Sequence, residues 1–261
     1  MATFRVGTAG WSIPKAFLNS FPPEGTHLER YSQVFNAVEI NSSFYRHHGT
    51  ATYAKWAACT PEDFQFSVKF SRIYSHENKL RIDDLDKFKE VLSGVGELGK
   101  KLGVLLIQIP PSLQFDSDLT EKFFDKFRNC YAGPLAFELR HSSWFSPEAL
   151  NLLAAFNIAK VHADPERCHG DFPRADINYF RLHGSPQIYK SSYESDALEE
   201  YVQQMKELGE SEAPVWCIFD NTAYGFATAN ALELMEKLGI GKKENAAFLG
   251  PRFQQTEGVR T

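Results

Sequence analysis

Three pairs of polar residues lie at the ends of short apolar runs. Within each pair, one residue separates the two members. The pairs are Glu39 and Asn41, Glu138 and Arg140, and Arg181 and His183. Carboxylate and imidazole groups can move protons as general acids and bases, and guanidinium groups can hold an anionic substrate. These residue types therefore predict acid–base chemistry on a small anionic molecule, provided that the chain brings the pairs together.

Other polar residues close further apolar runs of similar length. They are Lys69, Gln108, His162, Asp220 and Asn221. Polar groups next to apolar runs are costly to bury unless they are paired or used. Residues two apart in a strand point to the same face, so both members of each pair are expected to face the same way. Whether all these groups form one charged centre depends on the elements that carry them.

Eight apolar runs of strand length recur along the chain, and most are separated by enough residues for a helix. The runs are Phe4–Thr8, Ala37–Asn41, Phe64–Lys69, Val104–Gln108, Leu135–Arg140, Ile158–His162, Tyr179–His183 and Val215–Asn221. This alternation predicts an α/β fold, a (β/α)8 TIM barrel, in which the carboxyl ends of all strands form the site. The 261 residues match one such domain, whose usual size is about 250 residues.

Helical periodicity and capping signals predict helices between most of these runs. The predicted helices are His27–Phe35, Thr50–Ala58, Ile82–Leu102, Ser117–Cys130, Glu148–Phe156, Glu194–Leu208 and Ala227–Leu238. Between His162 and Tyr179 the sequence has loop chemistry, so we expect the sixth helix to be short or missing. We expect one domain over residues 1–240 and a polar tail over 241–261 that is partly disordered or folds over one end.

Six sequence motifs accompany these predicted strands in a fixed order. They are Val6–Ser12, Val38–Tyr45, Leu102–Pro111, Ala136–Trp144, Arg181–Gly184 and Phe219–Thr222. Together they resemble the DUF72 family, also called the YecE-like family, from about Val6 to Leu238. The resemblance implies a TIM-barrel fold and no particular reaction. Two positions depart from the family's usual pattern: Asp220-Asn221 stands in place of an Asn-Asn pair, and Phe17 stands where a second Trp often occurs.

The strand ends supply four candidate catalytic residues: Glu39, Lys69, Glu138 and His183. Glu39 and Glu138 fall on the second and fifth strands, across the barrel from each other. Opposed carboxylates of this kind act as acid with base, or as acid with nucleophile. We expect Arg140 to lower the pKa of Glu138, which suits a base or a nucleophile.

An anion site is expected near Lys69, Arg140, Arg181 and the Gly184–Ser185 turn, because TIM barrels often bind phosphate beside the last two strands. Aromatic residues on the strand-end loops add surfaces on which a sugar or a base can stack. The predicted substrate-binding residues are Trp11, Asn41, Tyr45, Gln108, Arg140, Trp144, Arg181, Gly184 and Asn221. We therefore expect an enzyme, a hydrolase, lyase or isomerase, acting on a small anionic or phosphorylated substrate, with sugar derivatives among the candidates.

Three alternatives use the same residues. A divalent metal would draw on strand-end ligands, namely Glu39, Glu138, His162, Asp164, His183 and Asp220, although nearby cations oppose it. A nucleic-acid-binding protein, or a metal-dependent phosphodiesterase or endonuclease, would use the aromatic loops and basic residues, although the net charge of −5 counts against it. A non-catalytic small-molecule binder would bind without turnover.

Composition and short motifs give expectations about the compartment, membrane association and cofactors. The chain has four widely spaced cysteines and no CxxC, which predicts reduced thiols in a cytoplasmic protein. It shows no signal-peptide pattern and no apolar stretch that could span a bilayer, so we expect no membrane partner. Gly94–Gly99 matches GxGxxG inside a predicted helix, so we expect no dinucleotide cofactor. The oligomeric state stays open.

Overall fold

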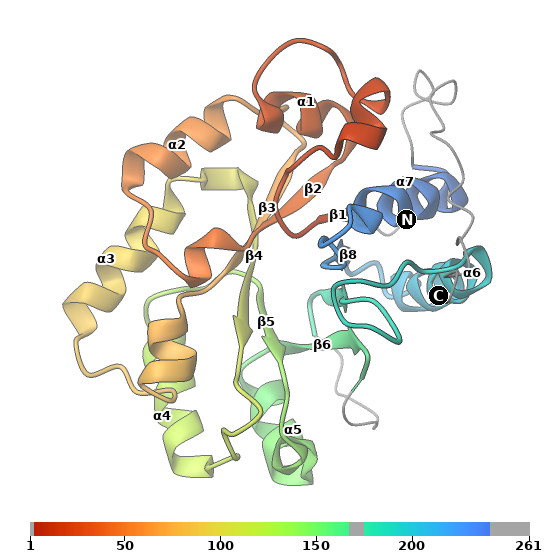
Figure 1. Ribbon diagram of the computed structural model, residues 1–261. Helices are drawn as coiled ribbons and strands as arrows, with labels where there is room; N and C mark the ends of the chain where they lie inside the picture. Colours follow the sequence, from red (N-terminus) through yellow and green to blue (C-terminus); the bar gives the residue numbers. More distant parts are fainter. Residues whose placement is uncertain (1–2, 167–174, 241–261) are drawn as a thin grey trace, which may run out of the picture.

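Eight parallel strands surrounded by helices form a nearly closed (β/α)8 barrel, which confirms the predicted fold class (Figure 1). The computed structural model describes residues 3–166 and 175–240. The strands are β1 (Phe4–Thr8), β2 (Ala37–Ile40), β3 (Gln65–Lys69), β4 (Leu102–Gln108), β5 (Leu135–Glu138), β6 (Ile158–Asp164), β7 (Asn178–Leu182) and β8 (Val215–Phe219). Each strand from β2 to β7 pairs in parallel with the strand that follows it, and β8 pairs in parallel with β1.

The α-helices follow the strands as predicted, and α1, α3, α4 and α5 begin at residues whose side chains cap them. They are α1 (His27–Val34), α2 (Thr50–Ala58), α3 (Leu85–Gly96), α4 (Ser117–Arg128), α5 (Pro147–Ala155), α6 (Ser195–Gly209) and α7 (Phe226–Leu238). Ser146 caps α5 by accepting a hydrogen bond from Ala149 N, with Pro147 at the first helical position. The α3 helix is shorter than the predicted 82–102, because Asp84 caps its start and Gly99 adopts a left-handed conformation soon after its end.

Short helical turns follow β1, β2, β3 and β5 on the side of the barrel where sites form, and a further one precedes β4. The 3-10 turns are η1 (Lys15–Ser20), η2 (Ser42–Phe44), η4 (Gly99–Lys101) and η5 (Ser142–Phe145), and η3 (Ile73–Glu77) is a π-helical turn. Most of the predicted helix-free segment between β6 and β7, residues 167–174, lies outside the described residues, as does the predicted tail 241–261. No described helix is long and apolar enough to cross a membrane. Of the four cysteines, Cys59, Cys130 and Cys217 are free thiols, and Cys168 lies outside the described residues.

The barrel interior is filled by side chains in two zones, apolar below and polar above. The lower zone holds ten apolar or aromatic residues: Ala37, Val104, Leu106, Ala136, Ala159, Val161, Ile177, Tyr179, Trp216 and Ile218. The alternate residues of the same strands face the helices and form a larger core rich in Phe. Because the pore is plugged from below, ligands can reach the polar zone only from the carboxyl ends of the strands.

The junction between β1 and β2 differs from the other seven, because side chains replace most of its backbone ladder. Only one isolated bridge, Ala9 with Glu39, joins the two strands in the described chain. The Asn36 side chain accepts from Val6 N and donates to Phe4 O, and the Tyr31 hydroxyl accepts from Thr8 N at 2.8 Å. Side chains from α1 and from the loop after it thus close the barrel at this seam.

Replacing Gly7 by alanine is expected to destabilise this seam. A Cβ at Gly7 would lie 2.0 Å from Ala37 O, so the two strand backbones would have to separate. We expect the free energy of unfolding to fall by about 1–3 kcal/mol, the usual effect of overpacking. Gly96→Ala is the matched control, since a Cβ there meets nothing within 4 Å. Urea unfolding of both variants tests this, and equal midpoints would contradict the proposed close approach.

Candidate active site

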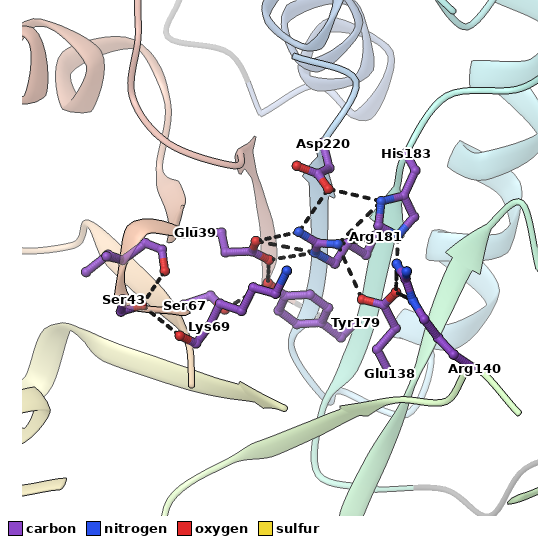
Figure 2. A network of polar contacts seen from close by, with 11 residues as sticks. Glu39, Ser43, Ser67, Lys69, Glu138, Arg140, Tyr179, Arg181, His183 and Asp220 are labelled. Carbon is purple, nitrogen blue, oxygen red and sulfur yellow. Dashed lines mark hydrogen bonds and ion pairs between the residues drawn. The ribbon is translucent and has the colours of Figure 1, made fainter. Parts of the chain in front are cut away.

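The guanidinium of Arg181 is the centre of the polar zone, and three carboxylates surround it (Figure 2). Its Nε donates to Glu39 Oε2 at 3.0 Å and its Nη2 donates to Glu39 Oε1 at 2.9 Å, a two-pronged pair. Nη1 lies 3.3 Å from Glu138 Oε2, and Nη2 lies 3.0 Å from Asp220 Oδ2. Arg181 and Glu39 are completely buried. Strands β2, β5, β7 and the end of β8 thus converge on one ion-pair network.

Below this network, Tyr179 anchors Glu39 from the same face of β7 as Arg181. The Tyr179 hydroxyl donates to Glu39 Oε2 at 3.1 Å and lies 2.8 Å from Ser67 Oγ. Burial, with the Glu39 charge next, raises the pKa of Tyr179 well above its usual value, so the hydroxyl keeps its proton. Glu39 is therefore saturated with donors, which makes it a residue that positions Arg181.

The imidazole of His183 is held by carboxylates on both sides. Nδ1 lies 3.0 Å from Asp220 Oδ2, and Nε2 lies 3.2 Å from Glu138 Oε1. Burial opposes its charge, but the hydrogen bonds to Asp220 and Glu138 raise the pKa of His183 above its usual value. Because carboxylates only accept hydrogen bonds, their positions favour the doubly protonated imidazolium. The Arg181 guanidinium, whose Nη1 lies 3.3 Å from both ring nitrogens, opposes that charge.

The two carboxylates that face His183 stay ionised in spite of their burial. Burial alone would raise the pKa of Glu138, but Arg181, His183 and Arg140 hold it well below its usual range. Arg181 and His183 likewise lower the pKa of Asp220 against the effect of burial. Arg140 Nε and Nη2 both donate to Glu138 Oε1, at 2.9 and 2.7 Å.

Lys69 enters the polar zone from β3 and is bound differently from the other charges. Its Nζ lies 4.4 Å from the centroid of the Phe44 ring and makes no hydrogen bond or ion pair with a described residue. Burial, with the Arg181 charge next, lowers the pKa of Lys69 to about 8. At neutral pH the network therefore carries the cations Arg140, Arg181, Lys69 and, when protonated, His183 against the carboxylates Glu39, Glu138 and Asp220.

A cavity of about 210 Å³ opens beside this network at the ends of β5, β6 and β7. Its lining includes Glu138, Arg140, Lys160, Val161, His183 and Tyr189. Arg140 reaches it with 19% of its side chain exposed, whereas the Arg181 side chain has none exposed. A small anion can thus approach Arg140 and His183 directly, with Arg181 behind them.

His76 belongs to this region and was not among the predicted site residues. It lies on the π-helical turn η3 after β3, where its ring meets the edge of Phe44 at 5.0 Å between centroids. Burial, then the charges of Lys69, Arg72 and Arg140, lower the pKa of His76. Single π-helical turns often mark functional positions, but nothing in the sequence indicated one here.

Two of the residues considered as metal ligands point away from the barrel interior. His162 stacks on Phe180 among the helices, and burial, with Lys160 next, lowers its pKa to about 4. Asp164 accepts a 2.6 Å hydrogen bond from the Tyr193 hydroxyl. Both share the outward face of β6, because Val161 and Ala163 take the inward positions. Within residues 3–166 and 175–240, no three His, Cys, Asp or Glu side chains are arranged to hold a metal ion.

Three predicted substrate-binding residues serve the protein's own structure. Trp144 is completely buried against Phe115 and Phe137, and its Nε1 donates to Leu113 O, so the expectation that it stacks on a ligand is wrong. Asn221 faces away from Asp220 and donates to Ser191 O and Asn230 Oδ1. The N–H of Gly184 donates to the Tyr193 hydroxyl at 2.8 Å and is not free for an anion.

The remaining predicted residues lie around the polar zone. Gln108 is buried on the inward face of β4, and Asn41 follows β2. Trp11 is partly buried and packs edge-on against Trp56 of α2. Tyr45 is 68% exposed on the loop after β2. The structure thus brings Glu39, Lys69, Glu138, Arg140, Arg181 and His183 together, with Asp220 as a further partner.

The stability of the protein is expected to depend on pH in opposite ways at the two ends of the range. The contribution of His183, whose pKa is raised, is complete below about 6.5 and is lost as the pH rises through its folded pKa. The contributions of Glu138 and Asp220, whose pKa values are lowered, are complete above about 4.5 and are lost as the pH falls through the folded values.

Asp220→Asn is expected to lower the pKa of His183, because it removes one of the two facing carboxylates. NMR titration of the His183 ring signals measures this directly. An unchanged titration in the variant would contradict the hydrogen-bonded geometry.

The architecture and the charged centre define a (β/α)8-barrel protein with its polar site at the carboxyl ends of the strands. Comparison with known proteins agrees. UPF0759 protein YunF of Bacillus subtilis is 27% identical over 272 residues, covering 90% of this chain and 94% of YunF. UPF0759 protein YecE of Escherichia coli K12 is 32% identical over 105 residues, 40% of this chain and 37% of YecE.

Solved structures extend the match to nearly the whole chain. A DUF72 family protein from Thermotoga maritima has a TM-score of 0.72 at 26% identity, covering 91% of this chain and 99% of its own. Another from Enterococcus faecalis has a TM-score of 0.78 at 19% identity, covering 97% and 100%. The family described as "Protein of unknown function DUF72" matches residues 5–255. This chain therefore belongs to the DUF72 family, as its motifs indicated.

Proposed function

We propose that this protein is an enzyme that binds a small anionic substrate in the cavity beside β5, β6 and β7 and uses His183 as its general acid and base. The observation that carries the proposal is the position of His183. Its two ring nitrogens lie between Glu138 and Asp220, on the wall of a cavity that also exposes Arg140. A histidine poised between carboxylates in a small cavity is suited to transfer protons near neutral pH.

The two nitrogens of His183 have different roles in this proposal. Nδ1 stays on Asp220, which fixes the ring and stabilises the imidazolium. Nε2 exchanges its proton with the substrate, because Glu138 keeps its contacts with Arg140 and Arg181 when it releases that nitrogen. Arg140 holds an anionic group next to the reacting centre at the cavity mouth, and protonated His183 gives the network its excess of positive charge.

His183→Asn is expected to reduce turnover at least about 100-fold, the usual contribution of a general acid–base residue. A panel of small carboxylates and phosphate monoesters is incubated with the protein, and product formation is followed by NMR. Gln33→Leu, on the exposed side of α1, is the control and should keep full activity. A substrate turned over equally by the His183 variant contradicts the proposed role. Panel compounds that bind but never react would identify a non-catalytic binder instead.

A further inference from the structure

Two buried donor groups on neighbouring strands of the polar zone lack a protein acceptor. Lys69 on β3 is 5% exposed, and Gln108 on β4 is 6% exposed. Within the described residues, Gln108 Nε2 has no hydrogen-bond partner, and Lys69 Nζ lies over the face of Phe44 without a hydrogen bond or ion pair. Leaving such groups unpaired costs stability. The Glu138, Arg181, His183 and Asp220 side chains, by contrast, are all paired.

The sheet register places these two donors on the same side of the mouth. Lys69 pairs with Leu106 across β3 and β4, and Gln108 follows Leu106 by two residues on the inward face. Asn41 adds an acceptor, because its Oδ1 is buried without a partner. The turn that carries Asn41 is fixed to the end of β3 by Ser43, whose Oγ lies 2.7 Å from both Ile40 O and Lys69 O.

The unpaired atoms specify a complementary ligand. An ammonium and an amide N–H on neighbouring strands of one barrel mouth match the oxygens of an anion. The amide oxygen of Asn41, on the turn after β2, matches a hydroxyl or another donor. Because Phe44 packs against Lys69 and fixes its Nζ without neutralising it, the positive charge stays available for the ligand.

We propose that Asn41, Lys69 and Gln108 form a subsite for an anionic oxygen with a neighbouring hydroxyl group, as in hydroxy acids and polyol phosphates. This proposal rests on the proposed function, since it names the substrate class of the same mouth. The substrate would then extend from this subsite over β2, β3 and β4 to His183 on β7. The reacting group lies beside His183 and Arg140, and a second anionic group, with its neighbouring hydroxyl, lies over Lys69.

Four probes separate the contribution of the anionic group to binding from that of the hydroxyl group. They are glycolate, acetate, glycerol 3-phosphate and glycerol. Calorimetric titration of the whole protein is expected to show that glycolate or glycerol 3-phosphate binds at least ten times more tightly than glycerol. The probe that binds more tightly identifies the anion as a carboxylate or a phosphate. Lys69→Met and Gln108→Leu should each weaken that binding at least tenfold. Asn41→Ala should remove the preference for glycolate over acetate.

Exposed residues of the same types provide the controls. Lys55→Met on α2 and Gln33→Leu on α1 should bind the probes like the wild type. Circular dichroism establishes that each variant is folded before binding is measured. Wild-type protein that prefers neither anion to glycerol would overturn the proposal, as would unchanged binding in both Lys69→Met and Gln108→Leu.

His183→Asn distinguishes this proposal from the proposed function. In the His183→Asn background, Lys69→Met and Gln108→Leu should still weaken probe binding at least tenfold, because the subsite lies on β2, β3 and β4 and not on β7. Probe binding that depends on Lys69 and Gln108, without any turnover in the substrate panel, would support the subsite and contradict the proposed enzymatic function. Turnover that depends on His183, with an unchanged KM in Lys69→Met and Gln108→Leu, would support the enzymatic function and contradict the subsite.

Discussion

Replacing Arg181 by methionine is expected to lower the free energy of unfolding by about 3–5 kcal/mol at neutral pH. The substitution keeps most of the side-chain volume but removes the cation between Glu39, Glu138 and Asp220. Those carboxylates are almost fully buried, and breaking a buried pair from one side leaves charges that cannot reach water. Urea unfolding followed by circular dichroism, with midpoint and slope both compared, measures the loss.

Arg140→Met is the matched control for this experiment. Arg140 pairs with Glu138 as well, but its side chain is 19% exposed and Glu138 keeps Arg181 as a partner. We expect a loss well below that of Arg181→Met. The difference between the variants should also shrink below about pH 4, where the carboxylates take up protons. Equal losses in both variants would show that Arg181 is not the centre of the network.

Replacing Lys69 by methionine is expected to have the opposite effect and to raise the free energy of unfolding. The pKa of Lys69 falls from 10.5 to about 8, chiefly through burial. At about 1.4 kcal/mol for each pKa unit, holding this lysine charged in the folded protein costs about 3 kcal/mol at neutral pH. Methionine removes that cost and packs on Phe44 as well as the lysine stem does.

The dependence on pH identifies the cause of this stabilisation. The folded protein releases the Lys69 proton at a lower pH than the unfolded chain does. Wild-type stability should therefore rise relative to the variant between about pH 8 and 10.5, until the advantage of Lys69→Met disappears. A constant advantage at every pH would point to packing alone, and a less stable variant at neutral pH would contradict the prediction.

The barrel and its inward-facing pairs could be predicted from the sequence, because they depend on the recurrence of apolar runs and on the two-residue alternation within a strand. Short apolar runs fixed the strands, and a spacing of two residues placed Glu138 with Arg140 and Arg181 with His183 on one face. The same rule carried one step further down β7 would have found Tyr179, which shares the inward face with Arg181. It would also have separated Asp220 from Asn221, since adjacent residues point to opposite faces.

Other features of the site depend on information that a run of residues does not contain. His162 ends its apolar run like the other polar residues, but the phase of β6 turns it toward the helices. Trp144 follows a strand on a loop, a place typical of ligand contacts, yet this loop folds back and buries it. His76 reaches the mouth through a π-helical turn, whose one-residue change of phase has no recognised sequence signal.

Glu39 takes part in both the closure of the barrel and the charged centre. Its backbone forms the bridge to Ala9 and accepts from Gly10 N at 2.8 Å, while its side chain holds Arg181. Strands β1 and β7, which are far apart in the sequence, thus both depend on one residue of β2. A folding intermediate that still has its seam open would lack the assembled network, so the site and the closed ring are expected to form in the same cooperative step. The protein would then acquire its chemistry only when its topology is complete.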